Sequence, residues 1–90
     1  MNKFIITDEG IFRYGDVQMH KDLLSVMEDC LGGGYWEINP FEQRLFLWGK
    51  SYDFGPPLWH HLDRLIVPEK LQGLRITYED EELDIPIEYR

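Results

Sequence analysis

The pattern of apolar and polar residues along the chain predicts a set of short strands and two helices. Residues 3–7 and 11–15 are predicted to form a hairpin, because the turn between them contains Gly10, which tolerates a positive φ angle. Residues 44–48 combine large apolar side chains with a closing Gly49, which is typical of a strand. The other predicted strands are residues 35–38, residues 74–78 and a short edge strand at residues 83–87, in which Pro86 limits further pairing.

The register of the first hairpin decides which charged residues meet. If Thr7 pairs with Ile11, then Lys3 and Arg13 share one face of the sheet, whereas a two-residue turn would separate them. A three-residue turn therefore predicts two cations near one end of the hairpin.

Helical spacing appears in two segments. Asp16 is a suitable N-cap for a helix that runs to about Cys30 and ends at residues 32–34, which are all glycine. Residues 56 and 57, both proline, suit the first turn of a second helix that ends at Pro68. The apolar positions of the two helices are Met19, Leu23, Val26, Met27 and Cys30, and then Leu58, Leu62, Leu65 and Ile66. The predicted fold is α+β, a single mixed β-sheet of about five to six strands with two helices packed on it.

Length and composition indicate one domain over residues 1–90. A chain of 90 residues with 43% hydrophobic residues has material for one core only. Cys30 is the only cysteine, so no internal disulfide forms, and no Cys/His cluster has the spacing of a metal site. We expect no metal and no cofactor.

Charge and hydropathy exclude two classes of partner. The net charge of −8, with no stripe of Lys and Arg, disfavours nucleic acid. No apolar run is long enough for a secretion signal or a membrane span, so a cytoplasmic protein without membrane contact is expected. The sequence does not predict an oligomeric state.

Two motifs resemble those of a known family. The run at residues 30–34 reads Cys-Leu-Gly-Gly-Gly, and residues 49–56 read Gly-x-Ser-x-x-x-Gly-Pro. These motifs resemble the phosphohistidine phosphatase (Janus) family, which carries the same glycine run and a similar serine-containing loop. Lys3, Arg13 and His20 stand where that family has a Lys, an Arg and a His, and the resemblance covers about residues 3–78.

The resemblance implies a metal-independent hydrolysis of the N–P bond in phosphohistidine or phospholysine. His20 is then the catalytic residue, as general base or nucleophile, and the substrate is a phosphorylated protein or a small phosphoramidate. Ser51 and the amides of Tyr52 and Asp53 would hold the phosphoryl oxygens, with Lys3 and Arg13 adding positive charge. Such a site fits phosphoryl transfer, which depends on positioning and on electrostatic stabilisation. The start of the predicted first helix would favour a neutral His20.

Two positions depart from the family pattern. Tyr35 stands where an Arg is frequent, and Asp53 stands where the family has a small residue, so the site has one cation fewer and one carboxylate more. These departures favour an alternative, a catalytically degenerate relative that acts as a protein-binding module through its aromatic or acidic surface. A weaker alternative is an acidic mimic of nucleic acid.

Overall fold

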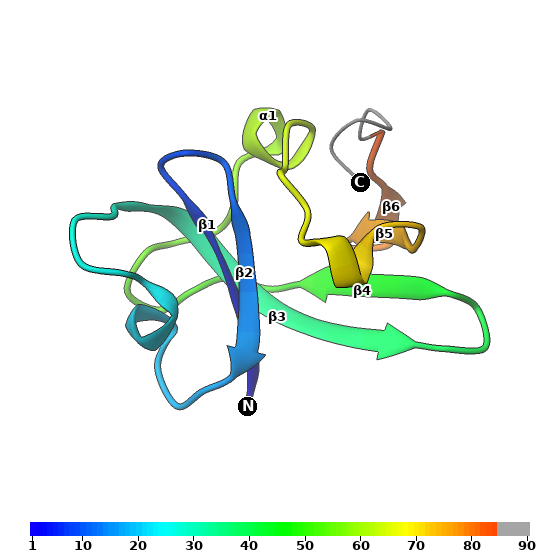
Figure 1. Ribbon diagram of the computed structural model, residues 1–90, viewed down its shortest axis with the longest axis horizontal. Coiled ribbons are helices and arrows are strands. Elements are labelled where there is room, and N and C mark those ends of the chain that lie inside the picture. Colours follow the sequence, from blue (N-terminus) through cyan, green and yellow to red (C-terminus); the bar gives the residue numbers. More distant parts are fainter. Residues whose placement is uncertain (85–90) are drawn as a thin grey trace.

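The computed structural model describes residues 1–84, which form one six-stranded mixed sheet (Figure 1). The strands are β1 (Asn2–Thr7), β2 (Phe12–Asp16), β3 (Cys30–Asn39), β4 (Arg44–Trp48), β5 (Arg75–Tyr78) and β6 (Glu81–Glu82). Their order across the sheet is β2-β1-β3-β4-β5-β6. Only β4 and β5 are parallel, and every other neighbouring pair is antiparallel.

The predicted pair of packed helices is wrong. The described residues contain only three short helical segments, η1 (His20–Leu23), α1 (Trp59–Leu62) and η2 (Glu69–Leu71), and none has more than four residues. No helix within residues 1–84 has the length and hydrophobicity to cross a membrane. The α+β interpretation with two helices is therefore replaced by a mostly β fold.

The first predicted helix does not form, because the chain at its predicted end belongs to strand β3. Residues 30–34 pair with β1, from Thr7 opposite Cys30 to Phe4 opposite Gly34, and this pairing requires extended backbone. Val26 and Met27, which a helix would have buried, are 91% and 95% exposed. The glycine run is thus part of β3 and does not end a helix.

The second predicted helix stops early because Ile66 pairs with the first hairpin. The Ile66 amide donates to Gly10 O at 2.9 Å, and Ile66 O accepts from the Phe12 amide at 3.1 Å. These two bonds hold the chain extended beside β2, so α1 ends at Leu62.

The register predicted for the first hairpin is confirmed. Ile6 lies opposite Phe12, and the Thr7 amide donates to Ile11 O at 3.0 Å. Because Ile5 lies opposite Arg13, Lys3 and Arg13 are on the same face of the sheet.

One face of the sheet, the core face, carries the hydrophobic core. Side chains alternate between the two faces along each strand. Phe4, Leu47 and Tyr78 point to the core face. The connection from β4 to β5, which contains α1 and η2, covers this face (Figure 1). It contributes the buried residues Leu62, Leu65, Val67 and Leu71.

The opposite face, here the outer face, is covered over only part of its area. Residues 17–29 and the loop at residues 50–55 pack near β1 and the first half of β3. The outer face of β4 carries Phe46 and the partly exposed Trp48.

The chain turns sharply between β5 and β6. Glu79 and Asp80 both have left-handed backbone, with φ angles of 49° and 68°, which two-residue hairpin turns require. The predicted edge strand at residues 83–87 is not where β6 lies, because β6 covers Glu81–Glu82. Leu83 and Asp84 are not in a strand, and residues 85–87 lie outside the described part of the chain.

Candidate functional site

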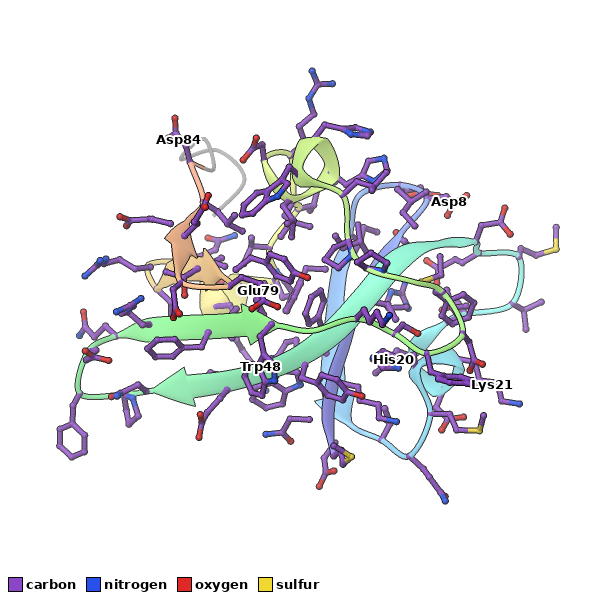
Figure 2. The ribbon with its side chains drawn as sticks, turned by 180° about the vertical axis from the view of Figure 1, so that it is seen from behind. Asp8, His20, Lys21, Trp48, Glu79 and Asp84 are labelled. Atoms are coloured by element: carbon purple, nitrogen blue, oxygen red, sulfur yellow. The ribbon has the colours of Figure 1, made fainter. Side chains whose placement is uncertain are left out.

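His20 lies at the start of η1 and is buried against the outer face of β3 (Figure 2). Its side chain is 3% exposed, and its Nε2 donates to Gly34 O at 2.8 Å. Because a carbonyl oxygen only accepts, this bond places the ring proton on Nε2 and leaves the lone pair of a neutral ring on Nδ1. The sheet therefore fixes both the tautomer and the orientation of the ring.

The surroundings of His20 favour its neutral form. Burial has the largest effect and lowers the pKa of His20 below its ordinary value. The hydrogen bond to Gly34 opposes this effect, the charge of Lys3 lowers the pKa and the charge of Asp53 raises it. The expected helix dipole plays no part here because η1 has only four residues. His20 is kept neutral by burial and not by a helix.

Gly33 joins His20 to the serine-containing loop. A Cβ atom on Gly33 would lie 3.2 Å from His20 Cδ2 and would collide with the carbonyl oxygen of Phe4. On its other side, Gly33 O accepts from the Ser51 amide at 2.9 Å, and the Gly33 amide donates to Gly55 O at 3.1 Å. The missing side chain thus makes room for the imidazole while the backbone holds the loop.

The loop residues differ in their roles. Ser51 is buried, and its Oγ accepts from the Phe54 amide at 3.1 Å, so this hydroxyl stabilises the loop. Tyr52 is 96% exposed. Within residues 1–84, the amides of Tyr52 and Asp53 donate no hydrogen bond, which leaves two adjacent donors at the tip of the loop.

The two predicted cations have different surroundings. Lys3 Nζ donates to Gln18 O, and its charge acts on His20. Arg13 forms an ion pair with Glu28 at 2.7 Å and donates to Ser25 Oγ at 2.8 Å. Arg13 thus fastens the segment before β3 to β2, and a phosphate would compete there with a carboxylate.

Four of the six predicted site residues therefore come together. The charges of Lys3 and Asp53 both act on the pKa of His20, and the Ser51 amide donates to the carbonyl oxygen of Gly33, the glycine next to the His20 ring. Sequence reasoning missed Glu28 as the partner of Arg13, and it missed the role of Gly34 O, which no side-chain motif could reveal. Tyr35 also belongs to the site, since its ring lies edge-on to His20 with centroids 5.7 Å apart. No three His, Cys, Asp or Glu side chains of the described residues are grouped so that they could hold a metal ion.

Comparison of the chain with known protein families, with curated proteins and with solved structures finds no match. The resemblance to the phosphohistidine phosphatases therefore stays a prediction from the two motifs.

Proposed function

We propose that the chain is a metal-independent phosphatase that hydrolyses the N–P bond of phosphohistidine or phospholysine at His20. The observation that carries this proposal is the hydrogen bond from His20 Nε2 to Gly34 O, at 2.8 Å. It orients the ring, leaves Nδ1 as the basic nitrogen and opposes part of the lowering of the His20 pKa by burial.

The neighbouring groups suit the charge that develops on a phosphoryl group. Lys3 supplies a positive charge within electrostatic reach of His20, and the amides of Tyr52 and Asp53 have hydrogen atoms to donate. Nδ1 either takes a proton from the attacking water or attacks phosphorus itself. In both cases the N–P bonding electrons go to the leaving nitrogen, which takes up a proton. In the second case water then cleaves the phosphorus bond to His20.

Hydrolysis of phosphohistidine and phospholysine, followed by ³¹P NMR with EDTA present, tests this proposal. His20→Gln keeps an N–H donor for Gly34 but removes the basic nitrogen, so we expect the rate to fall on the order of 10²-fold or more. His60→Gln is the matched control, because His60 is exposed on α1. Circular dichroism establishes that both variants fold. Equal rates for the wild type and folded His20→Gln, or no turnover by the wild type, would overturn the proposal.

A second candidate is a catalytically degenerate relative that binds a partner protein. The ion pair between Arg13 and Glu28 favours it, because it occupies one of the cations that the family site would use. Inorganic phosphate separates the candidates, since a ligand that binds only the folded state raises the melting temperature. A melting temperature that does not change with phosphate supports the degenerate relative.

A further inference from the structure

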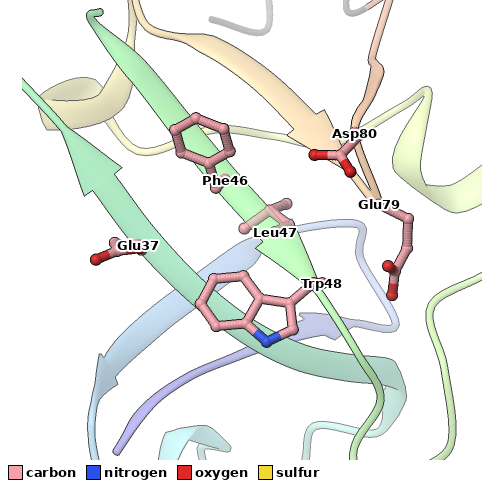
Figure 3. A pocket seen from close by; sticks show the side chains of 6 residues that line it. All are labelled: Glu37, Phe46, Leu47, Trp48, Glu79 and Asp80. Carbon is pink, nitrogen blue, oxygen red and sulfur yellow. The ribbon is translucent and has the colours of Figure 1, made fainter.

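Two hollows lie next to each other on the outer face of β3 and β4. The first has a volume of about 390 Å³ and is lined by Glu37, Phe46, Leu47, Trp48, Glu79 and Asp80 (Figure 3). The second, of about 570 Å³, is lined by Met1, Asn2, Tyr35, Trp36, Glu37 and Trp48. The two hollows share Glu37 and Trp48, and we call them together the Trp48 trough.

Aromatic rings and carboxylates both line this trough. Trp48 is 40% exposed, and Tyr35 lies beside it with ring centroids 6.2 Å apart. Figure 3 shows Glu37 on one side of β4 and Glu79 and Asp80 on the other side. The trough thus has an apolar floor between acidic walls.

The carboxylates of the trough are available to a partner. Glu79 Oε1 accepts from the Gly49 amide at 2.8 Å, whereas the carboxylates of Glu37 and Asp80 form no hydrogen bond or ion pair within residues 1–84. All three side chains are exposed. The net charge of −8 adds a long-range attraction for cations and a repulsion for phosphate groups of nucleic acids.

The protein itself shows what chemistry suits this surface. The Arg44 guanidinium lies over the Phe46 ring, 4.4 Å from its centroid, two residues from Trp48 on the same face of β4. A planar guanidinium stacks on an aromatic ring and pairs with a carboxylate at the same time, which an ammonium group does less well. Trp48 offers a similar ring surface in a hollow that Glu37, Glu79 and Asp80 also line, and no cation lies above it among the described residues.

We propose that the Trp48 trough binds an extended, arginine-rich segment of a partner protein, with one guanidinium stacked on Trp48 between Glu37 and Asp80. Side chains two residues apart in an extended segment point to the same side, so two of them fit the hollows on either side of Trp48. This proposal does not rest on the proposed hydrolysis at His20, although Tyr35 lies next to both His20 and Trp48.

Isothermal titration calorimetry at low ionic strength, with an unstructured peptide of alternating arginine and serine, tests the proposal. Glu37→Gln combined with Asp80→Asn should weaken binding about tenfold, because two ion pairs to the peptide are lost and both flank the guanidinium stacked on Trp48. Trp48→Leu keeps an apolar side chain but removes the indole ring, and should weaken binding about fivefold.

The matched control removes the same charge elsewhere. Glu9 and Asp63 are exposed, have no side-chain hydrogen bond within the described residues, and lie on the first hairpin turn and after α1. Glu9→Gln combined with Asp63→Asn should change the affinity less than about twofold, because only the long-range field changes.

Three results would overturn the proposal. The first is that the wild type does not bind the arginine peptide, the second is that the two charge-removing double variants weaken binding equally, and the third is that Trp48→Leu binds as tightly as the wild type. Equal affinity for a peptide of alternating glutamate and serine would exclude a cation-binding trough. Concentration-dependent dimerisation that Trp48→Leu abolishes would assign the trough to a second copy of the chain.

Discussion

Replacement of Gly33 by alanine tests the geometry of the candidate site directly. The new methyl group would collide with the carbonyl oxygen of Phe4 and lie 3.2 Å from His20 Cδ2 and 3.3 Å from Ile5 Cγ2. The Phe4 carbonyl belongs to the backbone of β1 and Ile5 is fully buried, so neither can move without disturbing the sheet. The strand pairing and the position of His20 must both change.

The size of the effect follows from two opposing contributions. Overpacking of this kind costs about 1–3 kcal/mol, and the clash with a backbone atom places Gly33→Ala at the upper end. Alanine leaves the unfolded chain less conformational freedom than glycine does, and this effect stabilises the folded state by about 0.5 kcal/mol. We expect a net destabilisation of about 2.5 kcal/mol, which lowers the melting temperature of a domain of this size by roughly 10–20 °C.

Gly15 provides the matched control, because it also lies in a strand and has an ordinary φ angle. A Cβ atom there would meet Leu23 Cδ2 at 3.3 Å, the end of a flexible side chain. Gly15→Ala should therefore change the stability by less than about 1 kcal/mol. Urea unfolding followed by tryptophan fluorescence gives both values. A Gly33→Ala protein as stable as Gly15→Ala would refute the close approach of β1, β3 and His20.

Three further predictions concern the charged groups of the site. Burial lowers the pKa of His20 in the folded state, so the unfolded state binds more protons and stability should fall as the pH drops below the unfolded pKa of about 6.5. Unfolding of His20→Gln should lack this part of the pH dependence, and an unchanged dependence would contradict it. In NMR titrations of the His20 ring, Lys3→Gln should raise the pKa of His20 and Asp53→Asn should lower it. An unchanged His20 pKa in both variants would show that these two charges do not act on the ring. A double-mutant cycle of Arg13→Ala and Glu28→Ala should give a coupling energy of about 1 kcal/mol that decreases with salt, and additive effects would count against the ion pair.

The parts of the fold that the sequence could predict depend on short-range patterns. Residues 44–48 are bounded as predicted, and the hairpin register follows from the length of its turn. Both depend on residues that are close in sequence. The two helices are predicted from the same kind of short-range pattern, but contacts between distant residues determine the conformation of these segments. Cys30 pairs with Thr7, and Ile66 pairs with the first hairpin.

The candidate site shows the same limit. The motifs led to Lys3, His20, Ser51 and Asp53, which the structure places around β3. They could not show that Arg13 pairs with Glu28, because that contact depends on where the segment before β3 returns to β2. The Trp48 trough did leave a signal, because in residues 44–48 Phe46 and Trp48 alternate with Leu45 and Leu47. A strand with apolar side chains on both faces requires a second cover, and the described residues provide only part of one.

The parallel pairing of β4 with β5 has a consequence for the speed of folding. The hairpin of β1 and β2 closes over three residues and can form within about 1–10 μs. β5, in contrast, joins β4 only after residues 49–74 have folded back across the core face, and the entropy of closing such a long loop is lost before the contacts form. We therefore expect folding on the time scale of milliseconds to seconds that is typical of sheets with distant partners, with β5 added late. Until then the edge of β4 is unpaired, and newly made chains are most prone to associate with one another during that interval.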